Sequence, residues 1–152
     1  MKTRLASATL GALLLTATPY ASAQLDIEDA IYYRQAGYGF MSWNMGKIKA
    51  QTIDESVPFN QEQVAAAANV IAAIANSGMG ALYPAGSAKG DTKLKPEFFE
   101  KLDEVGRIAK EFNAAANNLA SVAASGDKAA IAKAFGEVGK NCKACHEQFR
   151  AD

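Results

Sequence analysis

Apolar side chains recur at alternating steps of three and four residues along four long stretches of the chain. This spacing places them on one face of an α-helix, as in helices that pack against other helices. The stretches begin near Asp26, Asn60, Pro96 and Asp127. Their inward-facing positions are Ile27, Ile31, Arg34, Tyr38, Met41, Met45 and Ile48; Val64, Ala67, Ile71 and Ile74; Phe98, Leu102, Val105, Ala109, Phe112, Ala116 and Leu119; and Ile131, Phe135, Val138, Cys142, Cys145 and Phe149. We therefore predict an all-α fold, an antiparallel up-down-up-down four-helix bundle.

Residues at the ends of these stretches match known helix-capping patterns. Asp26 is the expected N-cap of the first helix, and Asn60 that of the second, with Gln63 at the capping-box position. Pro96 suits the first turn of the third helix. Ser125-Gly126-Asp127 is expected to close that helix and cap the last one.

The last predicted helix contains the only two cysteines and the only histidine of the chain, as Cys142-Lys143-Ala144-Cys145-His146. C-x-x-C-H is the attachment signature of a c-type haem, in which two thiols add to the vinyl groups and the imidazole reaches the iron. On a helix the three side chains lie close together, and both cysteines occupy core positions. The sequence therefore predicts one haem c per chain, covalently bound through Cys142 and Cys145, with His146 as the metal ligand.

Three other interpretations of the motif are weaker. A disulfide between helical residues three apart gains little. A thioredoxin-type redox pair would follow a strand, and no strand pattern precedes this one. A structural zinc site needs about four ligands, and the chain has no second pair of Cys or His residues.

Residues 1–23 have the pattern of a secretory signal peptide, with a basic start, a short apolar run and the cleavage site Ala21-Ser22-Ala23. The apolar run is too short to span a bilayer, and no later stretch qualifies, so no membrane segment is predicted. Cleavage after Ala23 would leave residues 24–152 as a single four-helix haem domain. Export places that domain in the periplasm, outside the cytoplasm, where c-type haem is attached.

The charge balance excludes partners that need a strongly basic surface. The whole chain has 16 basic and 16 acidic residues, and removal of Lys2 and Arg4 with the signal peptide would leave it slightly negative. We therefore expect neither nucleic acid nor an anionic membrane surface as a partner.

Arg34 is the one charged residue among the inward-facing positions of the first helix. A buried charge needs a partner, because its desolvation is costly. One interpretation is that the side chain extends to solvent at the end of the bundle. The interpretation we favour is an ion pair with a haem propionate, to which the neighbouring Gln35 could add a hydrogen bond.

A second apolar line follows the flank of the first helix and consists of Tyr33, Ala36, Phe40 and Trp43. It predicts either contact with a neighbouring helix of the same bundle or a subunit interface, where aromatic side chains are enriched. The sequence pattern leaves both open.

With the haem motif close to the C-terminus of a four-helix chain, residues 24–152 resemble cytochrome c′, the class II c-type cytochromes. The segments that carry the resemblance are Tyr33-Arg34-Gln35-Ala36, Ala134-Phe135-Gly136-Glu137-Val138-Gly139, and the run from Cys142 to Arg150. Arg34-Gln35-Ala36-Gly37-Tyr38 and the run from Ala66 to Tyr83 are most similar to the proteins of purple sulfur phototrophs.

The resemblance implies a five-coordinate, high-spin haem with His146 as proximal ligand and Arg150 beside its ring. It implies that Arg34 and Gln35 meet the propionates, that Tyr38 covers the distal face and that Met41 is a neighbouring haem contact. It also implies a homodimer joined through the first two helices, which favours the interface interpretation of the apolar line.

The remaining question from the sequence is whether the iron has a sixth protein ligand. No second histidine exists, and the methionines after the predicted cleavage site are Met41, Met45 and Met79. The resemblance places Tyr38 over the iron, so we expect an open position that binds small gases such as NO and CO, with Tyr38, flanked by Gly37 and Gly39, as a movable gate. An electron-transfer cytochrome is the alternative. A peroxidase would need a distal acid or base, so we expect no enzyme. No redox partner is indicated.

Overall fold

The computed structural model of the chain describes residues 25–152, and the predicted signal peptide lies outside these described residues. Four long helices and two short ones make up the fold, within the part of the chain that is described. In chain order they are α1 (Ile27–Thr52), α2 (Gln61–Ala75), the short 3-10 helix η1 (Met79–Leu82), α3 (Glu97–Glu100), α4 (Leu102–Ala123) and α5 (Lys128–Phe149).

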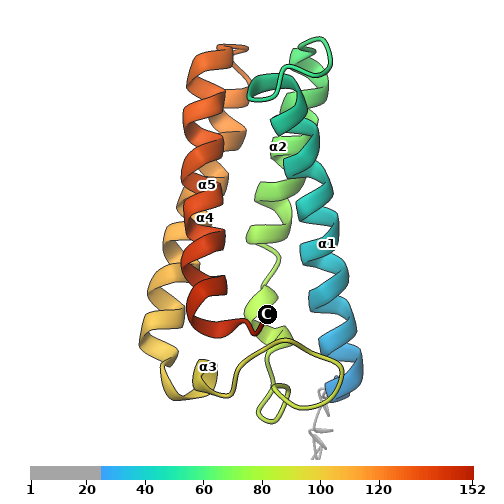
Figure 1. The fold of residues 1–152 in the computed structure, drawn as a ribbon, viewed down its shortest axis with the longest axis vertical. Coiled ribbons are helices and arrows are strands. Elements are labelled where there is room, and N and C mark those ends of the chain that lie inside the picture. Colours follow the sequence, from blue (N-terminus) through green and yellow to red (C-terminus); the bar gives the residue numbers. More distant parts are fainter. Residues whose placement is uncertain (1–24) are drawn as a thin grey trace, which may run out of the picture.

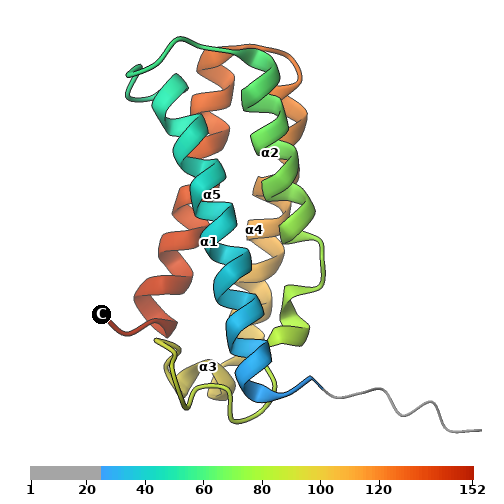
Figure 2. The same cartoon turned by 90° about the vertical axis from the view of Figure 1, so that its right-hand side faces the viewer.

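The long helices α1, α2, α4 and α5 form an antiparallel up-down-up-down bundle (Figure 1). The segments joining α1 to α2 and α4 to α5 lie at one end of the bundle. The opposite end gathers the start of α1, η1, α3 and the C-terminus (Figure 2). The predicted fold class is confirmed. Within residues 25–152, none of the helices has the length and apolar character needed to cross a membrane.

The main core lies between the four long helices. Its buried side chains are mostly branched aliphatic residues and alanines, and the small alanines let α2 approach its neighbours closely. The core consists of Met41, Ile48, Val64, Ala67, Ala68, Ile71, Ala75, Ala116, Leu119, Ala123, Ile131, Ala134 and Val138. A second cluster, formed by Phe98, Ile108 and Phe149, packs the end of the bundle at which α3 lies.

The caps follow the predicted positions, with one difference in the capping box. Asp26 and Asp127 accept hydrogen bonds at the starts of α1 and α5. The Asn60 side chain accepts from the Gln63 backbone N–H at 2.9 Å. The Asn60 backbone N–H donates to Gln51 Oε1 of α1, at 2.8 Å, and not to the side chain of Gln63. The start of α2 is therefore held by a tertiary contact as well as by its own cap.

The predicted third helix is interrupted at Lys101, whose backbone (φ −125°, ψ 45°) separates α3 from α4. Within α4 the expected core positions Leu102 and Ala109 are exposed, and Ile108, next to Ala109, is only 3% exposed, whereas Ala116 and Leu119 of the predicted face are buried as expected. Phe98 in α3 stays buried and packs edge-on against Phe149, with ring centroids 5.7 Å apart. The interruption thus places an aromatic residue against the end of α5.

The long connection between α2 and α3 is joined to the C-terminus by backbone hydrogen bonds. Leu94 and Arg150 form an antiparallel bridge. The Lys95 N–H donates to the Phe149 carbonyl and the Ala151 N–H to the Lys93 carbonyl, both at 2.8 Å. The last turn of α5 therefore has a defined position relative to this connection.

Arg34 joins the same connection to α1. Its guanidinium donates to Ser87 Oγ at 2.8 Å, to the Ser87 carbonyl at 2.6 Å, to Thr92 Oγ1 at 2.8 Å and to the Leu82 carbonyl at 3.3 Å. The side chain is only 3% exposed, so the interpretation that it extends to solvent is wrong. Gln35 adds a hydrogen bond from Nε2 to the Asp91 carbonyl at 2.8 Å.

Replacement of Arg34 by Met should lower the free energy of unfolding of the haem-loaded protein by about 2–4 kcal/mol. The reason is that the buried acceptors of Ser87 and the partly buried Leu82 carbonyl would lose their donor. Urea denaturation measures the loss, and hydrogen exchange should show weaker protection in residues 82–92. Arg107→Met is the matched control, because Arg107 makes only exposed ion pairs with Glu104 and Glu111. Equal losses in the two variants would contradict this role of Arg34.

Candidate haem site

The C-x-x-C-H residues lie together in the last turns of α5, which ends at Phe149. Cys142 and Cys145 are half-buried free thiols. His146 is exposed at the surface of the bundle. Helical spacing brings the three side chains close together, as the sequence predicted.

The protonation states of these groups suit attachment of a haem better than thiol redox chemistry. Burial raises the pKa of Cys142 and of Cys145, whereas a thioredoxin-type cysteine needs a lowered pKa. Although His146 is exposed overall, partial desolvation of its side chain, with a smaller contribution from the Arg150 charge, lowers its pKa. The imidazole is therefore neutral at neutral pH, which is the form that binds a metal.

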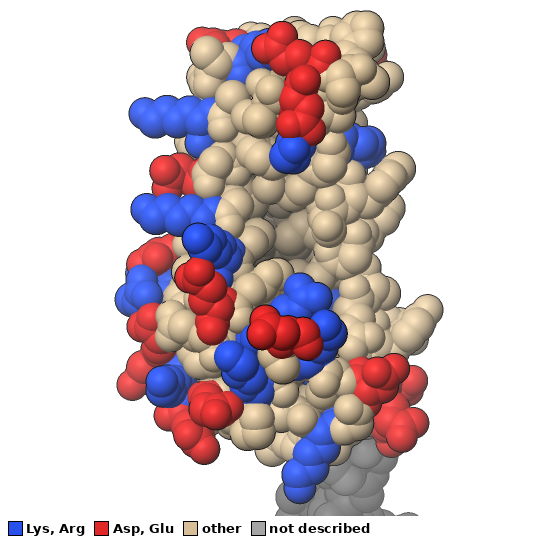
Figure 3. Space-filling model, in the orientation of Figure 1, with Lys and Arg blue, Asp and Glu red and all other residues tan. Residues whose placement is uncertain are grey.

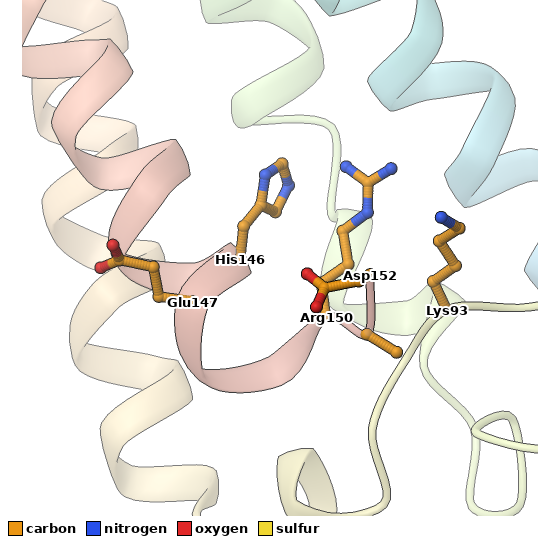
Figure 4. A pocket seen from close by; sticks show the side chains of 6 residues that line it. Lys93, His146, Glu147, Arg150 and Asp152 are labelled. Atoms are coloured by element: carbon orange, nitrogen blue, oxygen red, sulfur yellow. The ribbon is translucent and has the colours of Figure 1, made fainter.

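A small cavity of about 290 Å³ opens beside His146. It is lined by Lys93, His146, Glu147, Arg150, Ala151 and Asp152. In Figure 4 the His146 ring and the Arg150 guanidinium extend toward the gap that separates α5 from α1, whereas Glu147 points away from it. Figure 3 shows that the surface is hollowed between these two helices.

Arg34 supplies positive charge on the α1 side of this region. Burial lowers the pKa of its guanidinium, and nearby Tyr83 and Tyr38 partly offset that effect. All four hydrogen-bond acceptors of Arg34 are neutral groups. Among residues 25–152, no carboxylate forms an ion pair with it. Its charge is therefore available to an anionic group.

Tyr38 projects from the middle of α1 and remains 40% exposed, although its spacing placed it among the inward positions. The Tyr83 hydroxyl donates a hydrogen bond to the Tyr38 hydroxyl at 3.2 Å. Burial raises the pKa of both phenols, so both remain protonated at neutral pH. Met41, by contrast, is 4% exposed and packs in the main core.

The residues present fit a covalently attached haem. Two protonated thiols and a neutral imidazole share one helix end, next to a hollow in the surface, and α1 carries a cation for which no carboxylate partner is found among residues 25–152. In the described range 25–152, no three His, Cys, Asp or Glu side chains are grouped so that they could hold a metal ion.

Sequence reasoning did not find Tyr83, Ser87 or Thr92. Each contacts Arg34 or Tyr38 across more than forty residues of chain. These three residues lie in or beside an irregular connection without periodicity, so only the unpaired charge of Arg34 signalled that polar partners had to exist.

Comparison with known proteins agrees with this site. The family model described as Cytochrome C′ matches residues 29–150. A cytochrome c′ from the purple sulfur bacterium Allochromatium vinosum is 56% identical over 156 residues, covering 99% of each chain. The predicted resemblance to proteins of purple sulfur phototrophs is confirmed.

Solved structures with this fold include a cytochrome c′ described as having an unusual ligand-controlled dimer dissociation. It is 58% identical, covers 84% of this chain and 98% of its own, and has a TM-score of 0.80. Cytochrome c prime from Alcaligenes xylosoxidans, 27% identical, was solved with carbon monoxide bound in one variant (TM-score 0.74, covering 84% of this chain and 98% of that one). Another variant was solved as its nitric oxide complex (TM-score 0.75, 84% and 97%).

Cytochromes c′ carry covalently bound haem c, and the described part of the chain holds two cysteines for this attachment. The predicted cofactor is therefore confirmed. With the family model covering most of the chain and with relatives of such high identity, this chain belongs to the cytochrome c′ family.

Proposed function

We propose that the protein is a periplasmic haem protein that binds small gases such as NO and CO at an open sixth position of a five-coordinate, high-spin iron. The observation that carries the proposal is the asymmetry between α5 and α1. The end of α5 offers His146 as an imidazole ligand, whereas α1 offers the phenol of Tyr38, whose pKa is influenced by Cys142 and Cys145 of α5.

The methionines support an open position. Met41 and Met45 belong to the main core or pack against it. Met79 packs against α1, with its Cε 3.1 Å from the position that a Cβ would occupy at Gly37. All three thioethers thus have apolar packing partners, and the chain has no second histidine.

Each site residue is assigned the role in haem binding that the family resemblance implies. Cys142 and Cys145 hold the haem covalently, and His146 binds the iron as the neutral imidazole that its lowered pKa provides. Arg150 extends on the same side as the His146 ring (Figure 4). When bound, the haem supplies an iron that changes oxidation state and binds diatomic gases. On α1, Arg34 and Gln35 would bind the haem propionates, Arg34 through its positive charge. Met41 would be a further contact of the haem.

The same groups argue for ligand binding rather than catalysis. A peroxidase needs a distal acid or base with a pKa near neutrality, and burial moves the pKa of Tyr38 further above that range. We therefore assign no enzymatic activity. The bound gas complexes of the Alcaligenes xylosoxidans relative support NO and CO as ligands of this chain. Residues 1–23 are proposed to direct residues 24–152, one haem domain, to the periplasm.

The protein is further proposed to form a homodimer through its first two helices. Tyr33, Phe40 and Trp43 are 52%, 50% and 59% exposed, so they are not covered by a neighbouring helix of the same chain. Phe40 and Trp43 stack with centroids 5.5 Å apart, forming a flat aromatic surface that a second copy could cover. Because Tyr38 lies on the same helix, ligand binding and dimerisation could be coupled, as in the relative with ligand-controlled dimer dissociation.

Absorption spectra of the haem-loaded protein test the proposed coordination. We expect high-spin spectra in the ferric and ferrous states, and a shift of the ferrous spectrum when NO or CO is added. An iron with no sixth protein ligand gives this result because the added gas changes its coordination number. A low-spin spectrum in both oxidation states, unchanged by either gas, would instead identify an electron-transfer cytochrome.

If the Tyr38 side chain must move before a ligand enters, its replacement by Ala should speed CO association at least about tenfold. A factor of ten in rate corresponds to about 1.4 kcal/mol of activation free energy, which the shorter side chain would no longer contribute. Flash photolysis of the ferrous CO complex measures the rate. Leu102→Ala, which shortens an exposed side chain on α4, is the control and should leave the rate unchanged. Unchanged kinetics in the Tyr38 variant would rule out the gate.

The dimer surface can be tested by Phe40→Glu. A two-fold interface contains every substitution twice, so two carboxylates would be desolvated, and the dimer dissociation constant should rise at least about 100-fold. Analytical ultracentrifugation measures this change. Leu102→Glu, on an equally exposed position of α4, is the matched control. The proposed surface is wrong if both variants dimerise as the unmodified protein does.

A further inference from the structure

The hydroxyls of Tyr83 and Tyr38 form a hydrogen bond, with Tyr83 as donor and an oxygen–oxygen distance of 3.2 Å. We propose that Tyr83 is a positioning residue that holds Tyr38 in the closed position of the gate and thereby sets the rate at which gases enter. This inference rests on the proposed function, because it assigns the partner that Tyr38 leaves when a ligand binds.

Tyr83 is the rigid member of the pair. Its ring stacks on Phe98, with centroids 4.5 Å apart and planes inclined by 14°. The Arg34 guanidinium lies over the same ring, 4.9 Å from its centroid. Phe98 itself is buried against Phe149, and Arg34 is held by Ser87. Aromatic stacking and the cation–π contact therefore restrain the Tyr83 ring on a well-packed base.

Tyr38 is the movable member. Its side chain is 40% exposed, and it lies between two glycines on α1. A Cβ at Gly39 would meet no atom within 4 Å, so nothing packs against the helix at that point. Among the described residues, Tyr83 is the hydrogen-bond partner of the Tyr38 side chain. Movement of Tyr38 away from its closed position must therefore break this bond.

Both phenols stay protonated at neutral pH, since burial raises the pKa of each. The contact is therefore a hydrogen bond between two neutral hydroxyls, and it restrains the Tyr38 side chain through its terminal oxygen.

The test is a double-substitution cycle with Tyr83→Phe, Tyr38→Phe and the two combined, each studied as the haem-loaded protein. Phenylalanine keeps both rings and the stack on Phe98, and removes only the hydrogen bond. CO association to the ferrous form should become about two- to tenfold faster in each single variant, the range expected for loss of one such bond. The combined variant should match the single ones, because all three lack the same contact.

A second measurement does not depend on gas binding. The urea midpoint of the ferric protein should fall in both single variants and should fall no further in the combined variant. Tyr32→Phe is the matched control, because it removes a phenol hydroxyl from a side chain on α1 that is 65% exposed, and it should change neither measurement.

The outcomes separate the two proposals. If the unmodified protein binds no CO, the proposed function fails, and this inference fails with it. If CO binds but Tyr83→Phe leaves the association rate unchanged, gas binding stands and the positioning role is wrong. Independent, multiplying effects of Tyr83→Phe and Tyr38→Phe would likewise overturn it, because the two residues would then act separately.

Discussion

The buried cation of Arg34 is the interaction on which the rest of the structure depends. A guanidinium that is 3% exposed carries a large desolvation penalty, and four neutral acceptors offset only part of it. This arrangement does two things at once. It draws an irregular connection onto α1, and it leaves on α1 a positive charge with no carboxylate partner among residues 25–152. A cofactor with carboxylate groups would complete the charge balance, so binding of the haem should also stabilise the fold.

The connection that Arg34 holds also determines the position of the opposite wall of the site. Backbone hydrogen bonds join Lys95 to Phe149 and Lys93 to Ala151, so the same segment restrains the end of α5 that bears His146. Residues from α1 and α5 are therefore positioned relative to each other through a third element, and not only through the bundle core. This explains why an irregular segment with four glycines and one proline in residues 78–95 can contribute to a precise site.

Periodicity and capping chemistry were sufficient to predict the four long helices, because both are local properties of the chain. The break at Lys101, between α3 and α4, was not predictable from spacing, because the alternating apolar pattern continues through it. What sets α3 apart is a tertiary contact, the packing of Phe98 against Phe149. The motif Cys142-x-x-Cys145-His146 identified the cofactor for the same local reason. Tyr83 could not be found in this way, because its contact with Tyr38 depends on how a non-periodic segment folds back onto α1.

Burial along α5 carries a further argument about the cofactor. Ile131 and Val138 are fully buried and Phe149 is only 2% exposed, whereas Cys142 and Cys145, the inward positions between Val138 and Phe149, are only half-buried. Tyr38 shows the same departure on α1, where its neighbour Met41 is packed in the core. Inward positions that protein atoms cover only partly, although their helical neighbours are buried, indicate that these faces pack against something other than another helix. A flat, largely apolar macrocycle with charged edges meets that requirement, and it would satisfy the cysteines, Tyr38 and Arg34 together.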